Sequence, residues 1–438
     1  MLPKIREDEY LYDVPDFQLG IEDTEVFVEE LKVFHGEFSD CFARSESGEN
    51  FFRYMRGQLS RLERKSVEPI AVSVSGTSSV RALQRSMNDA VWHEDKILRR
   101  YHEMLRDDMG CGDAVLIFDE SGFVKKGKDS AGVSRQYCGS VGKTENSQVG
   151  VFVGYAGPFG YGLADRRLFI PEKWFGDEYG ERRRKCGIAD DTVFKTKPQL
   201  AAEMFHSLNS GGVLPFRYVT ADSIYGNSPE FIEAIDSSGK IFMVSVSCDT
   251  RCWFHPPVTD KKMYNYKGEL HSKRVVAEGQ KNSFSFREFA ENLNDFFWYR
   301  RTVSEGSKGP AEYEFTKRRV VIAKDGLPWK TVWLIVKRTV GEKREYRYYI
   351  SNANLSTRLE TFVRLSGIRW AVEQCFEECK GELGMDHYEL RKYTGWNRHM
   401  LVCMLAHFFL WHIRIRLGKK HPLLPYLRSE CCLMLYCR

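Results

Sequence analysis

The chain has 438 residues, more than one ordinary domain contains, so two or three domains are expected. Hydrophobic residues make up 42% and charged residues 29%, which excludes a disordered chain and predicts folded cores. The formal net charge of +5 is too small to indicate a nucleic-acid-binding protein by itself. The twelve cysteines include no CxxC pair, so we expect the reduced thiols of an intracellular protein rather than a zinc site.

The distribution of charge is more informative than its sum. Residues 1–40 contain three basic and twelve acidic residues. Basic clusters follow, and the first of them includes Arg53, Arg56 and Arg64. An acidic leading segment with basic clusters behind it is compatible with binding a polyanion, although each cluster alone is equally well explained as a solvated helix face.

The two ends of the chain and its longest apolar stretch bear on where the protein works. The N-terminal segment MLPKIREDEY has no apolar run, which predicts no secretory signal and a cytoplasmic protein. The stretch from Met400 to Ile413 contains His407 and His412 and is too short and too mixed to span a bilayer, so it predicts a buried helix. The C-terminal segment SECCLMLYCR ends abruptly, as a truncated or frame-shifted end would.

Helical spacing of apolar residues dominates the first part of the chain. One predicted helix places its apolar residues on one face and its arginines on the other; these residues are Phe52, Met55, Leu59 and Leu62, and Arg53, Arg56 and Arg64. Similar spacing recurs over residues 80–91 and 97–104. We therefore predict a helical N-terminal domain over residues 1–108, either a DNA-end-binding unit or a plain helical bundle.

The middle of the chain alternates between strands and helices. Strands are predicted over residues 114–118, 149–156, 161–170, 216–221 and 241–246. The third and fourth strands are separated by a helix that Thr196 can cap and that Gly211 or Gly212 ends, and a short helix from Pro229 precedes the fifth strand. Three strands, a helix, a strand, a helix and a strand follow the order of an α/β, RNase H-like catalytic core, which we place at residues 109–247.

Residues 248–355 differ from the core around them. Aromatic and β-branched residues mixed with charges predict strands over 331–336 and 346–350, and Asp325-Gly326 predicts a tight turn. This segment is a predicted β-rich insertion. From Thr357 onward the spacing is helical again, so residues 356–438 are predicted to complete the core.

Two aspartates share one predicted setting. Asp119 and Asp222 each follow an apolar strand, and in the predicted fold these strands are neighbours at the centre of the sheet. Two carboxylates so close repel one another unless a cation neutralises them, and Mg²⁺ prefers such oxygen ligands. Either aspartate alone is better explained as a turn or helix-cap residue, so the prediction depends on a third carboxylate.

Glu373 supplies that third carboxylate. It lies in a predicted helix in which Arg369, Glu373 and Lys380 share one face. The three side chains could form an exposed ion-pair ladder, or Glu373 could complete a metal site while the two cations hold phosphates.

Four separated segments carry a family resemblance: FDESGFVKKG, RQYCGSVGKTENSQVGVF, VTADSIYG and GIRWAVEQCFEECKGELGMDHYELR. Together they resemble the DDE transposases of bacterial insertion sequences, in the branch with a Tyr-(2)-Arg-(3)-Glu-(6)-Lys signature and the group numbered seven hundred and one. The likeness extends from about Phe52 to His412. The signature tyrosine falls on Ser366 in this chain, and in relatives it helps to hold the DNA end during hairpin formation.

The resemblance implies a DNA transposase that cuts insertion-sequence ends and transfers the strands to target DNA. It implies that Asp119, Asp222 and Glu373 hold two Mg²⁺ ions, with Mn²⁺ tolerated, that Arg369 and Lys380 contact DNA, and that the N-terminal part and the insertion recognise the ends. A homodimer on paired ends, working on nucleoid DNA, is expected. No association with a membrane is expected. No ATP is expected either: Gly142-Lys143-Thr144 resembles the end of a phosphate-binding loop, but Tyr137 stands where that loop needs glycine.

Two other functions would account for some of these sequence features. One is a catalytically degenerate, transposase-derived protein that still binds DNA, and the other is an RNase H-like nuclease that does not join strands. The presence of all three acids favours an enzyme over the first, and the Arg–Glu–Lys helix and the large insertion argue against the second.

Overall fold

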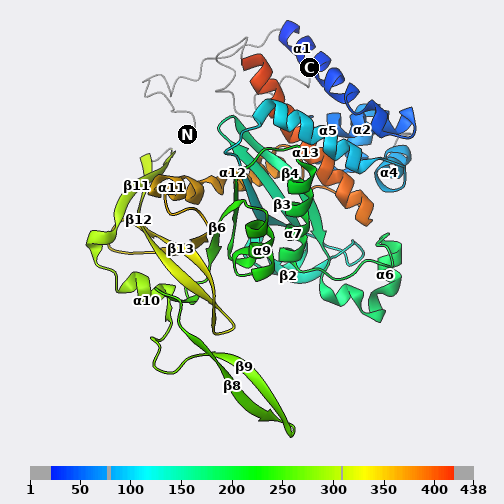
Figure 1. Cartoon of the computed structure of the whole chain (residues 1–438). Helices are drawn as coiled ribbons and strands as arrows, with labels where there is room; N and C mark the ends of the chain where they lie inside the picture. Colours follow the sequence, from blue (N-terminus) through cyan, green and yellow to red (C-terminus); the bar gives the residue numbers. More distant parts are fainter. Residues whose placement is uncertain (1–20, 76–79, 307–308, 419–438) are drawn as a thin grey trace. The chain divides into compact units, whose positions relative to one another are not determined.

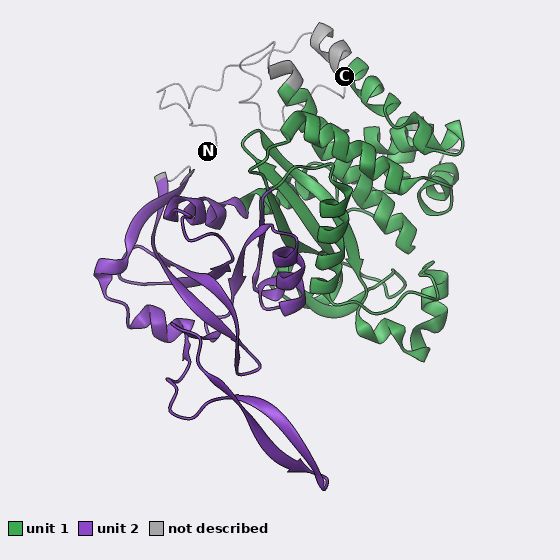
Figure 2. Cartoon of the chain, in the orientation of Figure 1, with its two compact units in different colours: residues 1–216, 370–438 green, residues 217–369 purple. Residues whose placement is uncertain are grey.

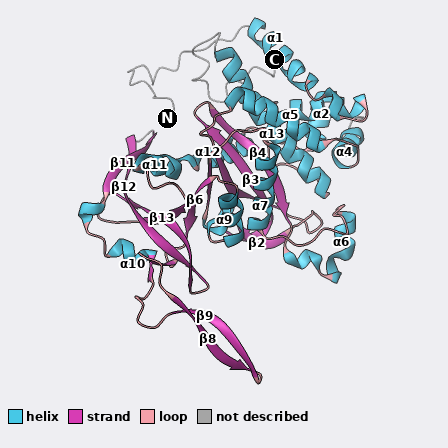
Figure 3. Cartoon of the chain, viewed as in Figure 1, coloured by secondary structure: helices cyan, strands magenta, loops and turns pink. Residues whose placement is uncertain are grey.

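The computed structural model describes residues 21–75, 80–306 and 309–418 (Figure 1). The chain divides into two compact units, residues 1–216 with 370–438 (unit 1) and residues 217–369 (unit 2) (Figure 2). Helices make up the first part of unit 1, and strands dominate unit 2 (Figure 3). The segment SECCLMLYCR lies outside the described residues. No helix within the described ranges is long and apolar enough to cross a membrane.

Four of the five N-terminal helices pack on one long helix near the C-terminus, and the third in chain order packs on its two neighbours. The five are α1 (Ile21–Gly36), α2 (Ser45–Gln58), α3 (Val67–Ser75), α4 (Val80–Asn88) and α5 (Glu94–Met109), and the long helix is α13 (Tyr393–Gly418). The ring of Phe34 in α1 lies 5.1 Å from that of Phe409, and the Tyr54 hydroxyl of α2 hydrogen-bonds to His399 Nδ1 at 2.8 Å. The predicted buried helix over Met400–Ile413 is confirmed as part of α13.

Helix α2 is shorter than its apolar spacing predicts. It ends before Leu62 and Arg64, so these residues do not continue its two faces. A Cβ on Gly57 would lie 2.3 Å from a side-chain carbon of Ile70, which shows that α3 approaches α2 closely there. The Ser60 hydroxyl donates to the Gly57 carbonyl at 2.6 Å and completes the turn.

Unit 1 contains an antiparallel sheet built on β3. Strand β3 pairs with β1 on one side and with β2 and β4 on the other; the bounds are β1 (Val115–Val124), β2 (Ser134–Cys138), β3 (Lys143–Gly157) and β4 (Gly160–Phe169). The three strands predicted here are present, β1 and β3 are longer than predicted, and β2 was not predicted. Helices α6 (Gly180–Lys185) and α7 (Lys197–Gly211) follow.

The ends of α7 follow the predicted signals. The Thr196 side chain accepts a hydrogen bond from the backbone N–H of Gln199, and the Gln199 side chain accepts one from the backbone N–H of Thr196, so the two form a capping box. Gly212 ends the helix with φ +62°, a conformation that glycine adopts without strain.

Unit 2 contains a mixed sheet and a separate hairpin. The sheet has the strand order β10-β7-β12-β13-β14-β6-β5, with β11 beside β12, and only β5 and β6 are parallel. The strands are β5 (Tyr218–Ala221), β6 (Ile241–Val246), β7 (Arg251–Trp253), β10 (Phe284–Ser285), β11 (Tyr299–Gly306), β12 (Gly309–Lys324), β13 (Leu327–Thr339) and β14 (Tyr346–Ser351). Strands β8 (Thr259–Tyr266) and β9 (Glu269–Val276) pair only with one another. The helices are α8 (Ser223–Gly226), α9 (Pro229–Ser237), α10 (Phe286–Glu291) and α11 (Leu359–Ile368).

The order of elements identifies the fold class. The strands β1, β3 and β4, the helix α7, the strand β5, the helix α9 and the strand β6 follow one another in the predicted order, and β2, α6 and α8 are additions to it. The chain has an α/β fold with an RNase H-like core, preceded by helices and interrupted by the β-rich segment β7–β14.

Candidate active site

Asp119 lies within β1 rather than at its end. The strand continues to Val124 because β3 is long enough to pair with the additional residues, and Asp119 itself lies opposite Phe152. The predicted position at a strand end was therefore wrong. Asp119 is 8% exposed, and its Oδ1 accepts a hydrogen bond from the backbone N–H of Glu120 at 2.9 Å.

The two faces of this sheet are covered by different helices. Glu120 forms an ion pair with Lys197 of α7 at 2.6 Å, so α7 covers the face opposite to Asp119. Directly opposite residues of an antiparallel pair point to the same face, so Asp119 and Phe152 share one. The rings of Phe152 and Phe376 have centroids 5.2 Å apart, and Phe376 belongs to α12 (Trp370–Gly381). Helix α12 therefore covers the face that carries Asp119.

Glu373 lies in the first turn of α12 and is exposed. The residue before it, Val372, is fully buried and packs on Gly154, where an added Cβ would lie 3.2 Å from the Val372 side chain. Gly154 lies two residues from Phe152 on the same face of β3. Asp119 and Glu373 thus lie on one face of unit 1, the first on a strand and the second on the helix that covers it.

Lys380, seven residues after Glu373 on α12, contacts the same strand. Its Nζ donates to the Gly122 carbonyl at 3.3 Å and lies 5.3 Å from the ring centroid of Phe123. Burial lowers the pKa of this ammonium group. A cation with these contacts is positioned beside β1, which disfavours the alternative of a fully solvated ion-pair ladder.

Arg369 does not belong to the helix that carries Glu373. Helices α11 and α12 are separate, and Arg369 is the residue between them, with φ −56° and ψ −29°. Helix α12 therefore carries Glu373 and Lys380 without Arg369, and a face shared by all three residues stays a prediction. Packing fixes the end of α11 independently, because a Cβ on Gly367 would lie 2.5 Å from a side-chain carbon of Val303.

Asp222 belongs to unit 2 and directly follows β5, as predicted. Its Oδ1 accepts a hydrogen bond from the backbone N–H of Ile224 at 2.9 Å and caps α8. A carboxylate has about four acceptor positions, so capping does not exclude a metal ion as a further ligand. Gly226 at the end of α8 allows close packing on β6, since a Cβ there would lie 1.9 Å from the Ser245 carbonyl oxygen.

A partly buried polar cluster on the helix that carries Glu373 was not predicted. Glu378 of α12 accepts a hydrogen bond from the Tyr161 hydroxyl at 2.8 Å and contacts His407 Nε2 at 2.7 Å. Burial alone would raise the pKa of Glu378, but His407, Tyr161 and Gln374 hold it below its ordinary value. The cluster joins α12 to α13 and β4, and its only sequence signal is a histidine within an apolar run.

An exposed tryptophan also lies beside Glu373. Trp370 is the first residue of α12 and is 52% exposed, with its ring centroid 5.8 Å from that of Tyr161. A large aromatic side chain that remains half exposed next to an acid is available to contact a ligand.

The arginines predicted to bind DNA are divided between α2 and the segment after it. Arg53 forms an ion pair with Glu49 at 3.2 Å, and Arg56 is exposed on the same helix. Arg64 lies beyond α2 and pairs with Glu389. The structure therefore does not place the three on one helix face.

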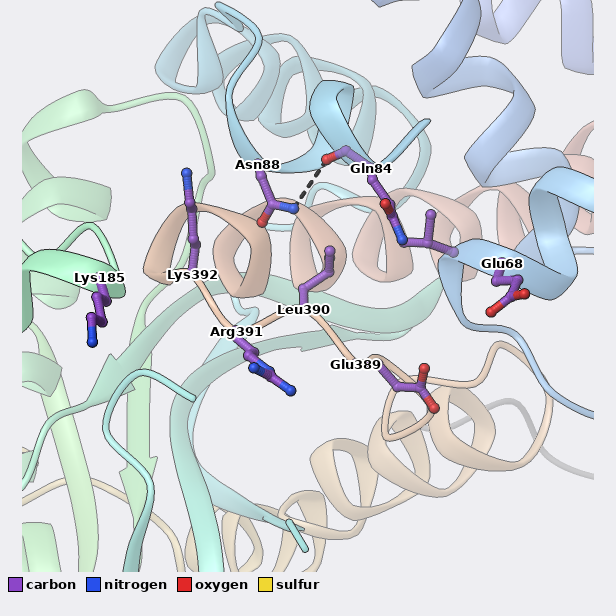
Figure 4. A pocket seen from close by; sticks show the side chains of 9 residues that line it. Glu68, Gln84, Asn88, Lys185, Glu389, Leu390, Arg391 and Lys392 are labelled. Carbon is purple, nitrogen blue, oxygen red and sulfur yellow. Dashed lines mark hydrogen bonds between the residues drawn. The ribbon is translucent and has the colours of Figure 1, made fainter. Parts of the chain in front are cut away.

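Unit 1 contains a cavity of about 360 Å³, and several of its lining side chains are drawn in Figure 4. Residues of α3, α4 and the segment 389–392 line it, together with Lys185. Neither Asp119 nor Glu373 lines this cavity, so it is distinct from the face on which the two carboxylates lie.

The three predicted metal ligands are divided between the units, Asp119 and Glu373 in unit 1 and Asp222 in unit 2. Across the described residues, no three His, Cys, Asp or Glu side chains are grouped closely enough to hold a metal ion. The donors themselves fit a hard divalent cation, because all three are carboxylates and none is a thiolate or an imidazole.

Comparison with known proteins assigns the family. The family model described as DDE superfamily endonuclease matches residues 37–310, more than half of the chain. The chain belongs to the DDE endonuclease superfamily. The matched range of this DDE endonuclease includes Asp119 and Asp222 and ends before Glu373.

A curated relative narrows the resemblance. The chain is 24% identical over 351 residues to a protein of Microchaete diplosiphon described as "Probable transposase for insertion sequence element IS701", covering 78% of this chain and 77% of the relative. The resemblance of this DDE endonuclease to insertion-sequence transposases of that group is confirmed.

Proposed function

We propose that the chain is a DNA transposase that cleaves the ends of an insertion sequence and transfers them to target DNA. The observation that supports it most is that Asp119 and Glu373 lie on one face of unit 1, in a chain of the DDE endonuclease superfamily. Asp119, Asp222 and Glu373 are the catalytic carboxylates in this proposal, and together they hold Mg²⁺, with Mn²⁺ tolerated.

Each group has a distinct part in the proposed reaction. Asp119, Asp222 and Glu373 would hold divalent ions, which would supply activation of the nucleophile (water in cleavage, the freed 3′-hydroxyl in strand transfer) and stabilisation of the leaving oxygen. Lys380, fixed against the Gly122 carbonyl, and Arg369 bind phosphates of the DNA end and orient it. Each step either hydrolyses a phosphodiester bond or exchanges one such bond for another, so ATP is not required.

The remaining parts of the proposal concern assembly and end recognition. Residues 1–108 form the end-binding domain, in which Arg53, Arg56 and Arg64 contact phosphates. The protein acts on nucleoid DNA in the cytoplasm as a homodimer that pairs two ends.

The test is incubation of the purified chain with a labelled duplex that carries the terminal repeat of its own element. With Mg²⁺ we expect cleavage at the repeat boundary and transfer products with an added target duplex, and with EDTA we expect binding alone. Binding without cleavage in Mg²⁺ and in Mn²⁺ would contradict the proposal in favour of a degenerate DNA-binding protein. Cleavage without any transfer product would favour a nuclease.

A further inference from the structure

The β8–β9 hairpin of unit 2 has few packing partners. All of β8 after Thr259 is exposed, and of β9 only His271, Val275 and Val276 are half-buried. Figure 2 shows the hairpin extending away from the rest of unit 2. A two-stranded hairpin that packs on nothing is marginally stable in water, so burial of apolar surface does not explain this one.

Positive charge is concentrated on the hairpin. Residues 259–276 contain five Lys or Arg and two Asp or Glu, a net charge of +3, whereas the whole chain has +5. Lys261 lies directly opposite Arg274, and Lys262 directly opposite Lys273. Like charges in these positions destabilise an antiparallel pair. Because successive pairs point to opposite faces, each face of the hairpin carries one of the two repulsive pairs.

Aromatic side chains accompany the cations on one face. Tyr264 and Tyr266 are 42% and 57% exposed, and both lie on the face that carries Lys262 and Lys273. The Lys273 Nζ lies 5.6 Å from the ring centroid of Tyr264. Exposed tyrosines and cations side by side offer hydroxyl and ammonium donors to the same anionic partner.

The turn between the strands places a further cation at the tip. Lys267 and Gly268 have φ of 53° and 88°, and the Asn265 side chain accepts a hydrogen bond from the Gly268 N–H at 3.0 Å. A two-residue turn with both φ positive favours asparagine followed by glycine, so lysine is a costly choice for the backbone. Lys267 offers a positive charge at the tip, which the favoured asparagine would not.

We propose that the β8–β9 hairpin is a DNA-binding arm whose cations contact phosphates along a groove of duplex DNA. A two-stranded ribbon fits the major groove, which is about 12 Å wide. Strands of this length extend roughly 26 Å, enough to follow the groove past several phosphates. Repulsion across the ladder is relieved when phosphates lie beside both pairs. The inference rests on the proposed function and assigns a specific surface to DNA binding.

The experiment measures the affinity of the full chain for a short labelled duplex of arbitrary sequence, in EDTA, over a range of salt concentrations. Lys267→Asn removes one charge and suits the turn better, so loss of binding cannot result from unfolding of the tip. Its control is Lys343→Asn, because Lys343 is 91% exposed in the turn between β13 and β14 of the same unit. A double variant, Lys261→Gln with Lys262→Gln, removes one member of each repulsive pair.

For Lys267→Asn we expect roughly two- to fivefold weaker binding at low salt and a plot of log affinity against log salt that is shallower by about 0.9, with thermal stability equal or higher. The double variant is expected to lower the slope by about twice as much. The Lys343→Asn control should match the unaltered chain.

If the unaltered chain and all variants of the β8–β9 hairpin bind the duplex with equal affinity and equal salt dependence, the hairpin is not a DNA-binding arm. That outcome would leave the transposase proposal intact. A change in sedimentation of the variants without a change in DNA binding would also overturn the DNA-binding arm, in favour of contact with a second copy of the chain. Failure of the unaltered chain to bind any duplex would overturn both proposals.

Discussion

The Asp119 face of unit 1 and the β8–β9 hairpin of unit 2 arrange charge in opposite ways. Asp119 is almost fully buried on a strand, and the helix that carries Glu373 is fixed by buried Val372 and Phe376. The cations of the hairpin lie on exposed strands that pack on little. Groups that hold a metal ion need rigid support, whereas phosphate contacts are numerous and tolerate mobility. Chemistry and DNA affinity are therefore expected to respond to different substitutions.

The largest effect is expected from the carboxylates. Glu373→Gln should lower the cleavage rate on a terminal-repeat duplex by roughly a thousandfold or more, because a metal ligand contributes several kcal/mol to the transition state. Asp119→Asn and Asp222→Asn should do the same. Affinity for the duplex, measured in EDTA, should change little in all three, unlike in the hairpin variants.

Glu377→Gln is the matched control for Glu373→Gln. Glu377 is exposed on α12, one helical turn after Glu373, so the same change of charge is made on the same helix. A cleavage rate of Glu373→Gln equal to that of the control would exclude Glu373 as a metal ligand.

A second substitution tests whether the carboxylate in unit 2 also depends on rigid packing. Gly226→Ala places a Cβ 1.9 Å from the Ser245 carbonyl oxygen, so α8 must move away from β6 and shift Asp222 with it. We expect the free energy of unfolding to fall by about 1–3 kcal/mol, and the cleavage rate to fall as well. Urea denaturation followed by circular dichroism measures the first effect.

Gly211→Ala provides the comparison for that substitution. Nothing lies within 4 Å of a Cβ at Gly211, which is the last residue of α7, so this change should be neutral or slightly stabilising. If both variants unfold at the same urea concentration, the close contact of α8 with β6 does not support Asp222.

The third prediction concerns the exposed aromatic side chain beside Glu373. Trp370→Ala should weaken positioning of the DNA end by about 1–3 kcal/mol, the usual value of base stacking on an aromatic ring. Single-turnover cleavage measures this, with Phe296→Ala as control, since Phe296 is 81% exposed in unit 2. Equal rates for the Trp370→Ala variant and the control would show that the ring does not contact the DNA.

Local sequence signals predicted those elements whose ends are fixed locally. The Thr196 cap and Gly212 set the limits of α7, and the Asp325-Gly326 turn has φ of 54° and 76° between β12 and β13. The limits of β1 depend instead on a distant segment. A glycine at position 122 is typical of a turn in sequence, but in the structure Gly122 lies within β1. Its missing Cβ makes room for Cys138, because a Cβ there would lie 2.4 Å from the Cys138 Sγ.

The features of the candidate site also divide into those visible in local sequence and those that depend on distant segments. Asp119, Asp222 and Glu373 could be predicted as site residues because an acid beside an apolar strand or on a patterned helix is visible in sequence. The break at Arg369 and the Glu378–His407 contact depend on packing between segments far apart in the chain, which periodicity does not contain. The separate β8–β9 hairpin was predicted only as part of a β-rich region, because its exposed strands lack the alternation of half-buried ones.

The smallest effect is expected at Ser366, where the resembled transposases carry the signature tyrosine. The Ser366 hydroxyl donates to the Val363 carbonyl of α11 at 2.8 Å, and serine offers no ring for a flipped base. Trp298 of unit 2 is 7% exposed beneath the Arg338 guanidinium, 3.9 Å from its ring centroid, so it does not provide a substitute platform. We therefore expect that hairpin-ended DNA is not an obligatory intermediate, and that Ser366→Tyr changes the product pattern little. Denaturing electrophoresis of a time course in Mg²⁺ tests this, and a hairpin band that forms and then decays into product at a matching rate would contradict it.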